Sequence, residues 1–257
     1  MTPRRSSSRS RPRTRRAARG ERIYVIGDVH GRYDLLRQLM RQIEQHSRSR
    51  KDAEKLHVLL LGDIVDRGPE SAQALHYLHD WTKQARGQHM LLGNHEDMML
   101  RTYRGDARTF RAWMRVGGRE TLASFGLHIG RDDDLYDPRI LRAVRDSLPH
   151  DLMTFIGTWP LTARSGDYFF CHAGVKPRVP LDRQSKQDLI WIRDEFLADE
   201  SDHGAVIVHG HSISPSIDRQ HNRIGIDTGA YHTGILTAAY FEDDQTDFIA
   251  TEQVSAS

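Results

Sequence analysis

The chain has 257 residues, of which 38% are hydrophobic and 28% are charged, and its formal net charge is +2. These values are typical of one large globular domain. Its mean hydropathy is −0.63, and no apolar run approaches the roughly 20 residues of a membrane-spanning helix. The single cysteine, Cys171, excludes an internal disulfide framework. Because no apolar stretch follows the basic N-terminus, as a secretory signal requires, we expect a cytoplasmic protein without membrane insertion.

The basic character of the chain is confined to its start. Residues 1–20 contain eight arginines and no acidic residue, so the remaining residues carry a formal net charge of −6. Such a segment has too little apolar surface to offset the entropy of ordering, and we expect a disordered basic tail over 1–20. Its arginines could bind nucleic acid or an anionic membrane through counterion release, but a solvated tail is the favoured interpretation.

Residues 21–257 are expected to form one domain, which opens with a threefold strand, loop and helix pattern. The apolar segments 23–26, 58–61 and 90–92 are each followed by a glycine-containing loop and then by apolar residues at helical spacing. Repeats of this kind form parallel sheets with right-handed crossovers, which place all the loops at one sheet edge. The pattern predicts an α/β fold with its ligand at that edge.

The second half of the chain departs from this pattern. Residues 101–160 are predicted to be mostly helical, as an insertion within the domain. Closely spaced strands then return, which favours a second and more antiparallel sheet. They are expected at 168–171, 205–208, 223–226, 235–241 and 247–251.

Three short motifs follow the first three strands. GDVHG at 27–31 contributes Asp28 and His30, GDIVDRG at 62–68 contributes Asp63, and GNHE at 93–96 contributes Asn94 and His95. Each motif by itself is typical of a solvated turn. Their occurrence at three equivalent strand ends instead indicates a metal site built from carboxylate, amide and imidazole ligands.

Two further histidines, His172 and His211, follow later strands, and a neutral imidazole at a strand end is a ready metal ligand. Oxygen and nitrogen ligands without thiolate suit manganese, iron or zinc. A carboxylate that bridges two ions suits a binuclear centre.

These strings resemble the signature of the phosphoprotein phosphatase family of metallophosphoesterases. FCHAGV at 170–175, DLIWIRDEF at 188–196, VHGHS at 208–212 and GIDTGA at 225–230 resemble its bacterial serine/threonine phosphatase branch, which includes bacteriophage lambda phosphatase. The resemblance extends from about residue 22 to residue 240 and implies a calcineurin-like fold, with two mixed β-sheets in a central sandwich flanked by helices.

The resemblance also implies roles for individual residues. It implies two divalent metal ions, with manganese expected and iron or zinc as alternatives. The first ion would be held by Asp28, His30 and Asp63, and the second by Asp63, Asn94, His172 and His211. The role of His209 stays open between a supporting contact and mere adjacency.

The expected reaction is in-line attack on phosphorus by a hydroxide shared between the two ions. His95 is the expected general acid for the leaving group, with Asp66 orienting its ring. Arg67 and Arg193 would bind the phosphate oxygens, although Arg193 could instead form a surface ion pair with Asp194 or Glu195. The predicted activity is that of a serine/threonine protein phosphatase whose partner is a phosphorylated protein or peptide.

Parts of the sequence also suggest three alternative functions. A cysteine nucleophile in a Cys-x5-Arg loop fails on spacing, because Pro177 stands where the arginine should follow Cys171. A dinucleoside polyphosphate hydrolase, such as one acting on diadenosine tetraphosphate, shares the first and third motifs, but that family tends to lack the acid at Asp66. A catalytically silent binding module is disfavoured by the complete set of ligands together with His95.

Overall fold

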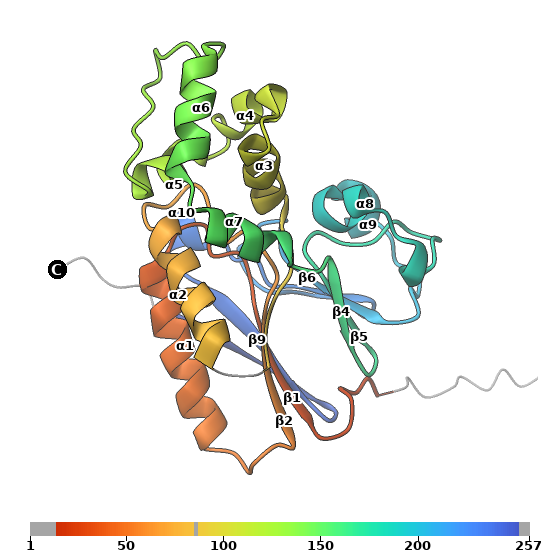
Figure 1. Cartoon of the computed structure of the whole chain (residues 1–257). Helices are drawn as coiled ribbons and strands as arrows, with labels where there is room; N and C mark the ends of the chain where they lie inside the picture. Colours follow the sequence, from red (N-terminus) through yellow and green to blue (C-terminus); the bar gives the residue numbers. More distant parts are fainter. Residues whose placement is uncertain (1–13, 85–86, 252–257) are drawn as a thin grey trace, which may run out of the picture.

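Two five-stranded sheets form the centre of the computed structural model, which describes residues 14–84 and 87–251 (Figure 1). The first sheet has the order β10-β9-β1-β2-β3, with β1 parallel to β2 and β2 parallel to β3, whereas β9 pairs antiparallel with both β1 and β10. Its strands are β1 (Glu21–Ile26), β2 (Lys55–Leu60), β3 (Gln88–Met90), β9 (Thr237–Glu242) and β10 (Gln245–Ala250).

The second sheet has the order β4-β5-β6-β8-β7. Its three inner strands run parallel to one another, and the two outer strands are antiparallel to their neighbours. The strands are β4 (Thr162–Ser165), β5 (Tyr168–Cys171), β6 (Val206–His209), β7 (Asp218–Arg219) and β8 (Arg223–Gly225). The predicted α/β fold with two mixed sheets is therefore confirmed.

The expectation of a more antiparallel second sheet was wrong: each sheet has two parallel and two antiparallel strand pairs, and not all of the later strands belong to the second sheet. β9 and β10 return to the first sheet, where Tyr24 of β1 lies opposite Tyr240 of β9. Close spacing along the chain correctly indicates the β9–β10 hairpin, but it cannot tell which sheet the hairpin joins. β3 also ends at Met90: the backbone N–H of Leu91 still donates to Leu60 O of β2, but that of Leu92 donates to Pro160 O outside the sheet.

Alternation along the strands explains why the sheets stack. On β1, Ile23 and Val25 face the second sheet, whereas Tyr24 and Ile26 face the helices, as period-two alternation requires. Residues from both sheets meet in one apolar layer, as in other β-sandwiches. The layer includes Val25, Leu59, Phe170, Val208, Ile224 and Phe241.

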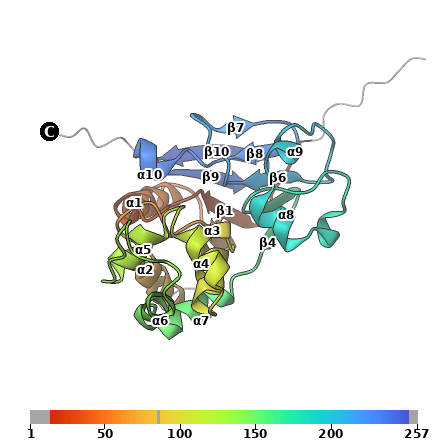
Figure 2. The same cartoon turned by 90° about the horizontal axis from the view of Figure 1, so that it is seen from above.

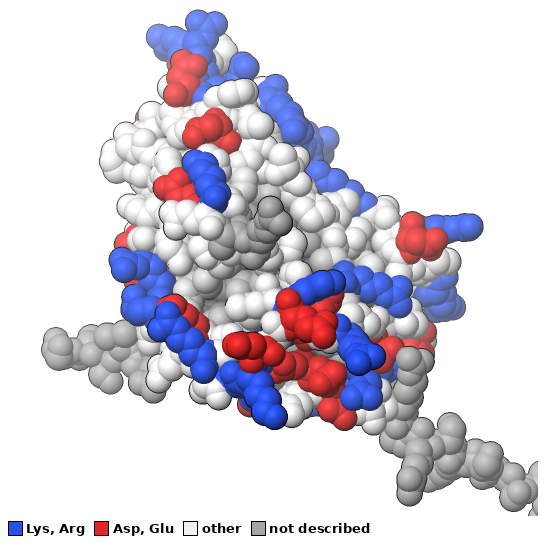
Figure 3. Space-filling view, turned by 60° about the horizontal axis from the view of Figure 1, so that its bottom comes forward, with Lys and Arg blue, Asp and Glu red and all other residues white. Residues whose placement is uncertain are grey.

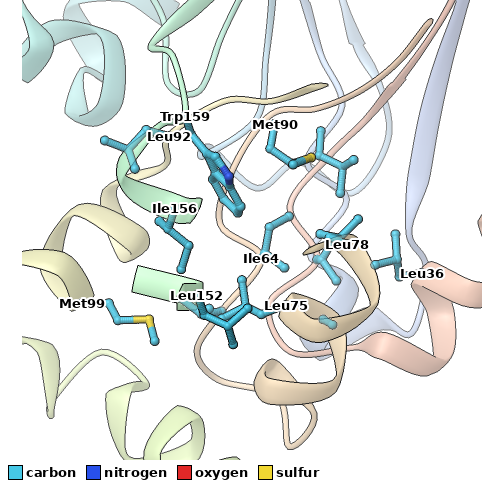
Figure 4. Packing of buried hydrophobic residues seen from close by; sticks show 14 of the residues in the cluster. Leu36, Ile64, Leu75, Leu78, Met90, Leu92, Met99, Leu152, Ile156 and Trp159 are labelled. Carbon is cyan, nitrogen blue, oxygen red and sulfur yellow. The ribbon is translucent and has the colours of Figure 1, made fainter. Parts of the chain in front are cut away.

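Helices cover both outer faces of the sandwich (Figures 1 and 2). Leu36, Leu75, Leu78 and Ile156 from three of these helices pack over the first sheet in one core (Figure 4). The helices associated with the first sheet are α1 (Tyr33–Arg48), α2 (Ser71–Gln84), α3 (Asn94–Tyr103), α4 (Ala107–Trp113), α5 (Gly118–Ser124), α6 (Pro138–Ser147) and α7 (His150–Gly157). The predicted insertion at 101–160 accordingly contains the end of α3 and all of α4 to α7.

The outer face of the second sheet is covered by α8 (Lys186–Trp191) and α9 (Asp194–Leu197), and the short α10 (Ala230–Thr233) precedes β9. A 3-10 turn at Leu181–Arg183 leads into α8. Within 14–84 and 87–251, no helix is both long enough and apolar enough to cross a bilayer.

The segment 14–20 corrects part of the predicted disordered tail. Ala17 is buried in the layer between the sheets, and its backbone N–H donates to Asp243 O at 2.7 Å. The N–H groups of Arg16 and Ala18 donate to Asp167 and Ser165. A small residue and its backbone hydrogen bonds therefore hold this segment, while residues 1–13 lie outside the described part of the chain.

Charged side chains of both signs are interspersed over the face shown in Figure 3. On this face the described chain therefore has no uniformly basic surface of the kind that binds nucleic acid.

Replacing Phe241 tests the layer between the sheets. Its buried ring lies 4.4 Å from that of Tyr168 and 5.9 Å from that of Phe170, measured between centroids. Phe241→Ala should lower the free energy of unfolding by about 3–5 kcal/mol, because it leaves a cavity. Leu56→Ala, at a strand position with 45% exposure, should change it by less than about 0.5 kcal/mol. Urea denaturation followed by circular dichroism measures both, and similar losses would contradict the assigned layer.

Candidate metal centre

The predicted ligands converge where the two sheets meet. Asp28 and His30 follow β1, Asp63 follows β2, and Asn94 begins α3 directly after the β3 loop. The second sheet contributes from the opposite side, with His172 after β5 and His211 after β6. All of these side chains, and that of His95, are at most 5% exposed.

Asp63 lies at the centre of this cluster. Its Oδ2 is 3.6 Å from His30 Nε2, 3.4 Å from His172 Nε2 and 3.8 Å from His95 Nε2. Potential ligand atoms of Asp63, His30 and His95 lie within 4.8 Å of one another, and those of Asp63, His172 and His211 form a second such group. Asp63 belongs to both groups, which is the arrangement that a bridging carboxylate requires.

The imidazoles are held so that a ring nitrogen faces the cluster. Hydrogen bonds link His30 Nδ1 to Val65 O at 2.9 Å and His172 Nδ1 to Leu61 O at 3.0 Å, which requires the proton on Nδ1 and leaves Nε2 as an acceptor. Burial lowers the pKa of His30 to about 3 and that of His211 to about 2. Both rings are therefore neutral at physiological pH, as metal ligation requires.

The donor set fits divalent cations. Asp28 Oδ1 and Asp227 Oδ2 are buried without a hydrogen-bond partner among the described residues. Burial, followed by the charges of Asp227 and Asp63, raises the pKa of Asp28 well above its usual range. Carboxylates buried close together are costly unless cations neutralise them. The oxygen and nitrogen donors, without any thiolate, suit such ions.

Both predicted arginines contact the cluster. Arg67 Nη2 lies 3.2 Å from His95 Nε2. Arg193 Nε donates to His211 Nε2 at 2.9 Å, and no ion pair of Arg193 with Asp194 or Glu195 forms in the described structure. The contact with His211 favours a place for Arg193 in the site over the surface ion pair.

His95 is paired with Asp66. Its Nδ1 donates to Asp66 Oδ2 at 2.5 Å, and Asp66 is completely buried. Burial disfavours the imidazolium, but the carboxylates of Asp63 and Asp66 outweigh it and raise the pKa of His95 to about 9. These carboxylates thus favour the protonated form of the ring, which a general acid needs.

Glu96 of the GNHE motif, for which the sequence predicts no role, organises two of the loops. Its carboxylate accepts hydrogen bonds from the backbone N–H groups of Asp63 (2.9 Å), Ile64 (2.7 Å), Val65 (3.2 Å) and Gly93 (3.1 Å). These bonds fix the backbone on which Asp63 stands. A buried acid three residues after the glycine of a strand-to-helix loop was the available signal.

The backbone is strained where the ligands project. Of the seven non-glycine residues with positive φ among those described, five belong to the predicted site. Such conformations cost free energy and persist where the surrounding structure enforces them, as at functional sites. The five are His30, Asp63, Asp66, Arg67 and His211, with φ between 45° and 77°.

Cys171 and His209 lie close to predicted ligands in the sequence but belong to neither group of ligands. Cys171 is buried, its Sγ donates to Gly174 O at 3.3 Å, and burial raises the pKa of its thiol, so it cannot act as a thiolate nucleophile at neutral pH. His209 Nδ1 donates to Gly210 O, and its ring packs edge-on against Phe196 at 5.0 Å. His209 therefore packs against Phe196 of α9.

A sandwich of two mixed sheets, with buried carboxylates and imidazoles gathered at the strand ends, defines a metal-dependent phosphoester hydrolase. The model of the family described as calcineurin-like phosphoesterase matches residues 21–249, and the chain belongs to this family. Membership of this family confirms the predictions of an enzyme and of a metallophosphoesterase. It does not show that the chain belongs to the branch that includes bacteriophage lambda phosphatase.

Known relatives carry two kinds of name. Bis(5'-nucleosyl)-tetraphosphatase, symmetrical, from Vibrio parahaemolyticus is 26% identical over 62% of this chain and 47% of its own length. The chain spans about half the length of the first such relatives that it matches. Serine/threonine-protein phosphatase 2 of Escherichia coli (strain K12) is 27% identical over 84% of this chain and 90% of its own length.

Solved structures share the fold. A crystal structure under the provisional name of diadenosine tetraphosphatase has a TM-score of 0.62 and 20% identity, and the match covers 91% of this chain and 95% of that one. At this identity the likeness concerns the fold alone.

Removing the shared carboxylate charge tests the centre. Asp63→Asn should lower the manganese bound after gel filtration from about two ions per chain to one or fewer, because both groups of ligands contain Asp63. The matched control is Asp97→Asn, which alters another buried carboxylate, one that pairs with Lys186 instead of facing the cluster. Elemental analysis measures both variants, and full metal content in Asp63→Asn would contradict the assignment of a shared ligand.

Proposed function

We propose that this hydrolase is a phosphomonoesterase that removes phosphate from phosphoserine and phosphothreonine in proteins or peptides, and that it also cleaves small aryl phosphates. The observation that carries the proposal is the buried Asp66–His95 pair beside Asp63. An alkoxide leaving from phosphoserine is strongly basic and needs a proton as its bond to phosphorus breaks, and His95, whose pKa is raised by Asp63 and Asp66, lies beside the metal ligands.

Two divalent cations, with manganese as the proposed metal, would supply charge neutralisation and Lewis-acid activation of water. Asp28, His30 and Asp63 would hold one ion, and Asp63, Asn94, His172 and His211 the other. Arg67 and Arg193 would bind phosphate oxygens through their forked N–H donors, which match phosphate geometry better than a lysine does.

The relatives support the protein phosphatase in one specific respect. The match to the serine/threonine phosphatase of Escherichia coli spans 90% of that protein, whereas the match to the Vibrio parahaemolyticus tetraphosphatase spans 47%. Of these two matches, the one to the protein phosphatase is therefore the more extensive. We assign it on this basis to the bacterial serine/threonine phosphatase branch, with a phosphorylated protein as its partner.

Hydrolysis of diadenosine tetraphosphate is the second candidate, because several relatives carry the name of symmetrical bis(5'-nucleosyl)-tetraphosphatase. A nucleotide is a weakly basic leaving group that needs little help from an acid. The elaborate support of Asp66 and His95 is therefore better explained by a basic alkoxide leaving group than by a nucleotide.

A parallel substrate assay distinguishes the candidates. Purified protein with manganese should hydrolyse phosphoserine and phosphothreonine peptides and p-nitrophenyl phosphate, with kcat/KM on the best peptide exceeding that on diadenosine tetraphosphate. Phosphate release and nucleotide chromatography measure the two reactions. Much faster turnover of the dinucleotide than of every phosphopeptide would overturn the proposal, and a phosphotyrosine peptide in the same series defines the range of side chains accepted.

His95→Asn tests the assigned proton donor. The variant should lose about 10²–10⁴-fold in kcat on phosphoserine peptides, the usual contribution of a general acid, while binding as much manganese as the wild type. His128→Asn, at an exposed position in the insertion, is the control and should behave as the wild type. Loss of metal from His95→Asn would show instead that His95 is a ligand, which its place in one of the two ligand groups makes a real alternative.

A further inference from the structure

We propose that the helical insertion is part of the proton-donating machinery, and that Trp113 and Thr121 are positioning residues that hold Asp66 and thereby His95. The inference rests on the proposed function, because it concerns the protonation of the leaving group. It assigns a role to the segment 113–121, which the motifs of the predicted site do not include.

Both carboxylate oxygens of Asp66 receive hydrogen bonds from the insertion. Trp113 Nε1 donates to Oδ2 at 2.7 Å, the same oxygen that accepts from His95 Nδ1 at 2.5 Å. Thr121 Oγ1 donates to Oδ1 at 2.6 Å. The hydroxyl of Thr121 also accepts from the backbone N–H of Asp66 at 2.9 Å, so it fixes the side chain and the main chain of Asp66 together.

Burial makes these bonds specific. Asp66, Trp113 and Thr121 are each 0% exposed, and hydrogen bonds to a charged group are strong in such surroundings. A buried carboxylate held from two directions cannot rotate away from His95 without leaving the indole N–H or the hydroxyl unpaired, which is costly. The donors therefore select one orientation of the carboxylate.

The backbones of the two segments are also fitted to each other. Asp66 and Arg67 have consecutive positive φ values of 77° and 69°, and the N–H of Arg67 donates to Gly117 O at 3.4 Å. Gly117 has a φ of 122°, and a Cβ there would lie 2.5 Å from Arg67 N. A Cβ on Gly118 would similarly meet the Trp113 ring at 2.6 Å. The two glycines allow the close approach that brings Trp113 and Thr121 to Asp66.

The chemical consequence depends on the leaving group. When the bond between phosphorus and the leaving oxygen breaks, its electron pair goes to that oxygen, and a proton from His95 Nε2 neutralises it. His95 Nδ1 keeps its proton and its bond to Asp66. A p-nitrophenolate departs without this proton, whereas a phenolate or a serine alkoxide depends on it increasingly. A displaced acid therefore slows reactions in proportion to leaving-group basicity, whereas a general folding defect slows all of them alike.

The test uses Trp113→Phe and Thr121→Val in the full chain, loaded with manganese. For each variant, kcat is measured on p-nitrophenyl phosphate, phenyl phosphate and a phosphoserine peptide. We expect the loss on the phosphoserine peptide to exceed the loss on p-nitrophenyl phosphate by about tenfold or more, since correct placement of a general acid contributes about 10²–10⁴-fold. Phenyl phosphate should lie between them.

Two matched controls separate the hydrogen bonds from packing. Thr121→Ser keeps the hydroxyl and should restore the leaving-group dependence of the wild type. Trp159→Phe removes an indole N–H from the same core, where Trp159 packs among Leu92, Ile156 and Met90 (Figure 4). Its Nε1 is buried without a partner among the described residues. Trp159→Phe should therefore leave the leaving-group dependence unchanged.

A second measurement does not depend on activity. The short bond from His95 Nδ1 to Asp66 should give a downfield proton resonance in the NMR spectrum of the wild type and of Thr121→Ser. We expect this resonance to shift or disappear in Trp113→Phe and Thr121→Val.

Equal losses on all three substrates together with an unchanged resonance would overturn the inference. Failure of the wild type to cleave phosphopeptides would instead overturn the proposed function. The comparison of the two aryl phosphates and the resonance would still decide the role of Trp113 and Thr121 in that case.

Discussion

The burial of Asp63 among imidazoles is the interaction on which the rest of the structure depends. Burial by itself would raise the pKa of this carboxylate, but the rings of His172 and His95 hold it well below its usual range. His30 belongs to the first sheet and His172 to the second, so Asp63 can meet both only where the two sheets face each other. The sandwich is therefore required for the centre, and a single sheet edge could not supply all of its ligands.

Hydrogen bonds to neighbouring segments hold the loop of Asp63 in this arrangement. Glu96 binds three successive backbone N–H groups of the Asp63 loop, and the positive φ of Asp63 persists because these bonds enforce it. The insertion contributes from the other side through Trp113 and Thr121. A rigid frame of this kind keeps reactive groups in place without a change of conformation during the reaction, which is the physical basis of electrostatic preorganisation.

Members of this family share the metal centre, so the centre by itself does not determine which phosphoester is cleaved. The groups beside it differ in what they can contribute. Asp66 and His95 are suited to protonating a basic leaving group, and Arg67 lies over the half-exposed ring of Tyr231 at 4.8 Å, at the edge of the site. A preference between a phosphoprotein and a dinucleotide would therefore have to arise from side chains around the ligands.

Local patterns in the sequence determined the elements and the order of the ligands. Short apolar segments marked β1 and β5, helical spacing marked α1 and α2, and polar residues directly after strands marked Asp28, Asp63 and His172. Only the tertiary structure decided contacts between segments that are far apart in the chain. It placed β9 beside β1, packed residues 14–20 against the ends of the sheets, and brought Trp113 and Thr121 to Asp66 across 47 and 55 residues. An indole N–H or a threonine hydroxyl on a helix has no local signature of its partner, because that partner is chosen by packing and not by the neighbouring sequence.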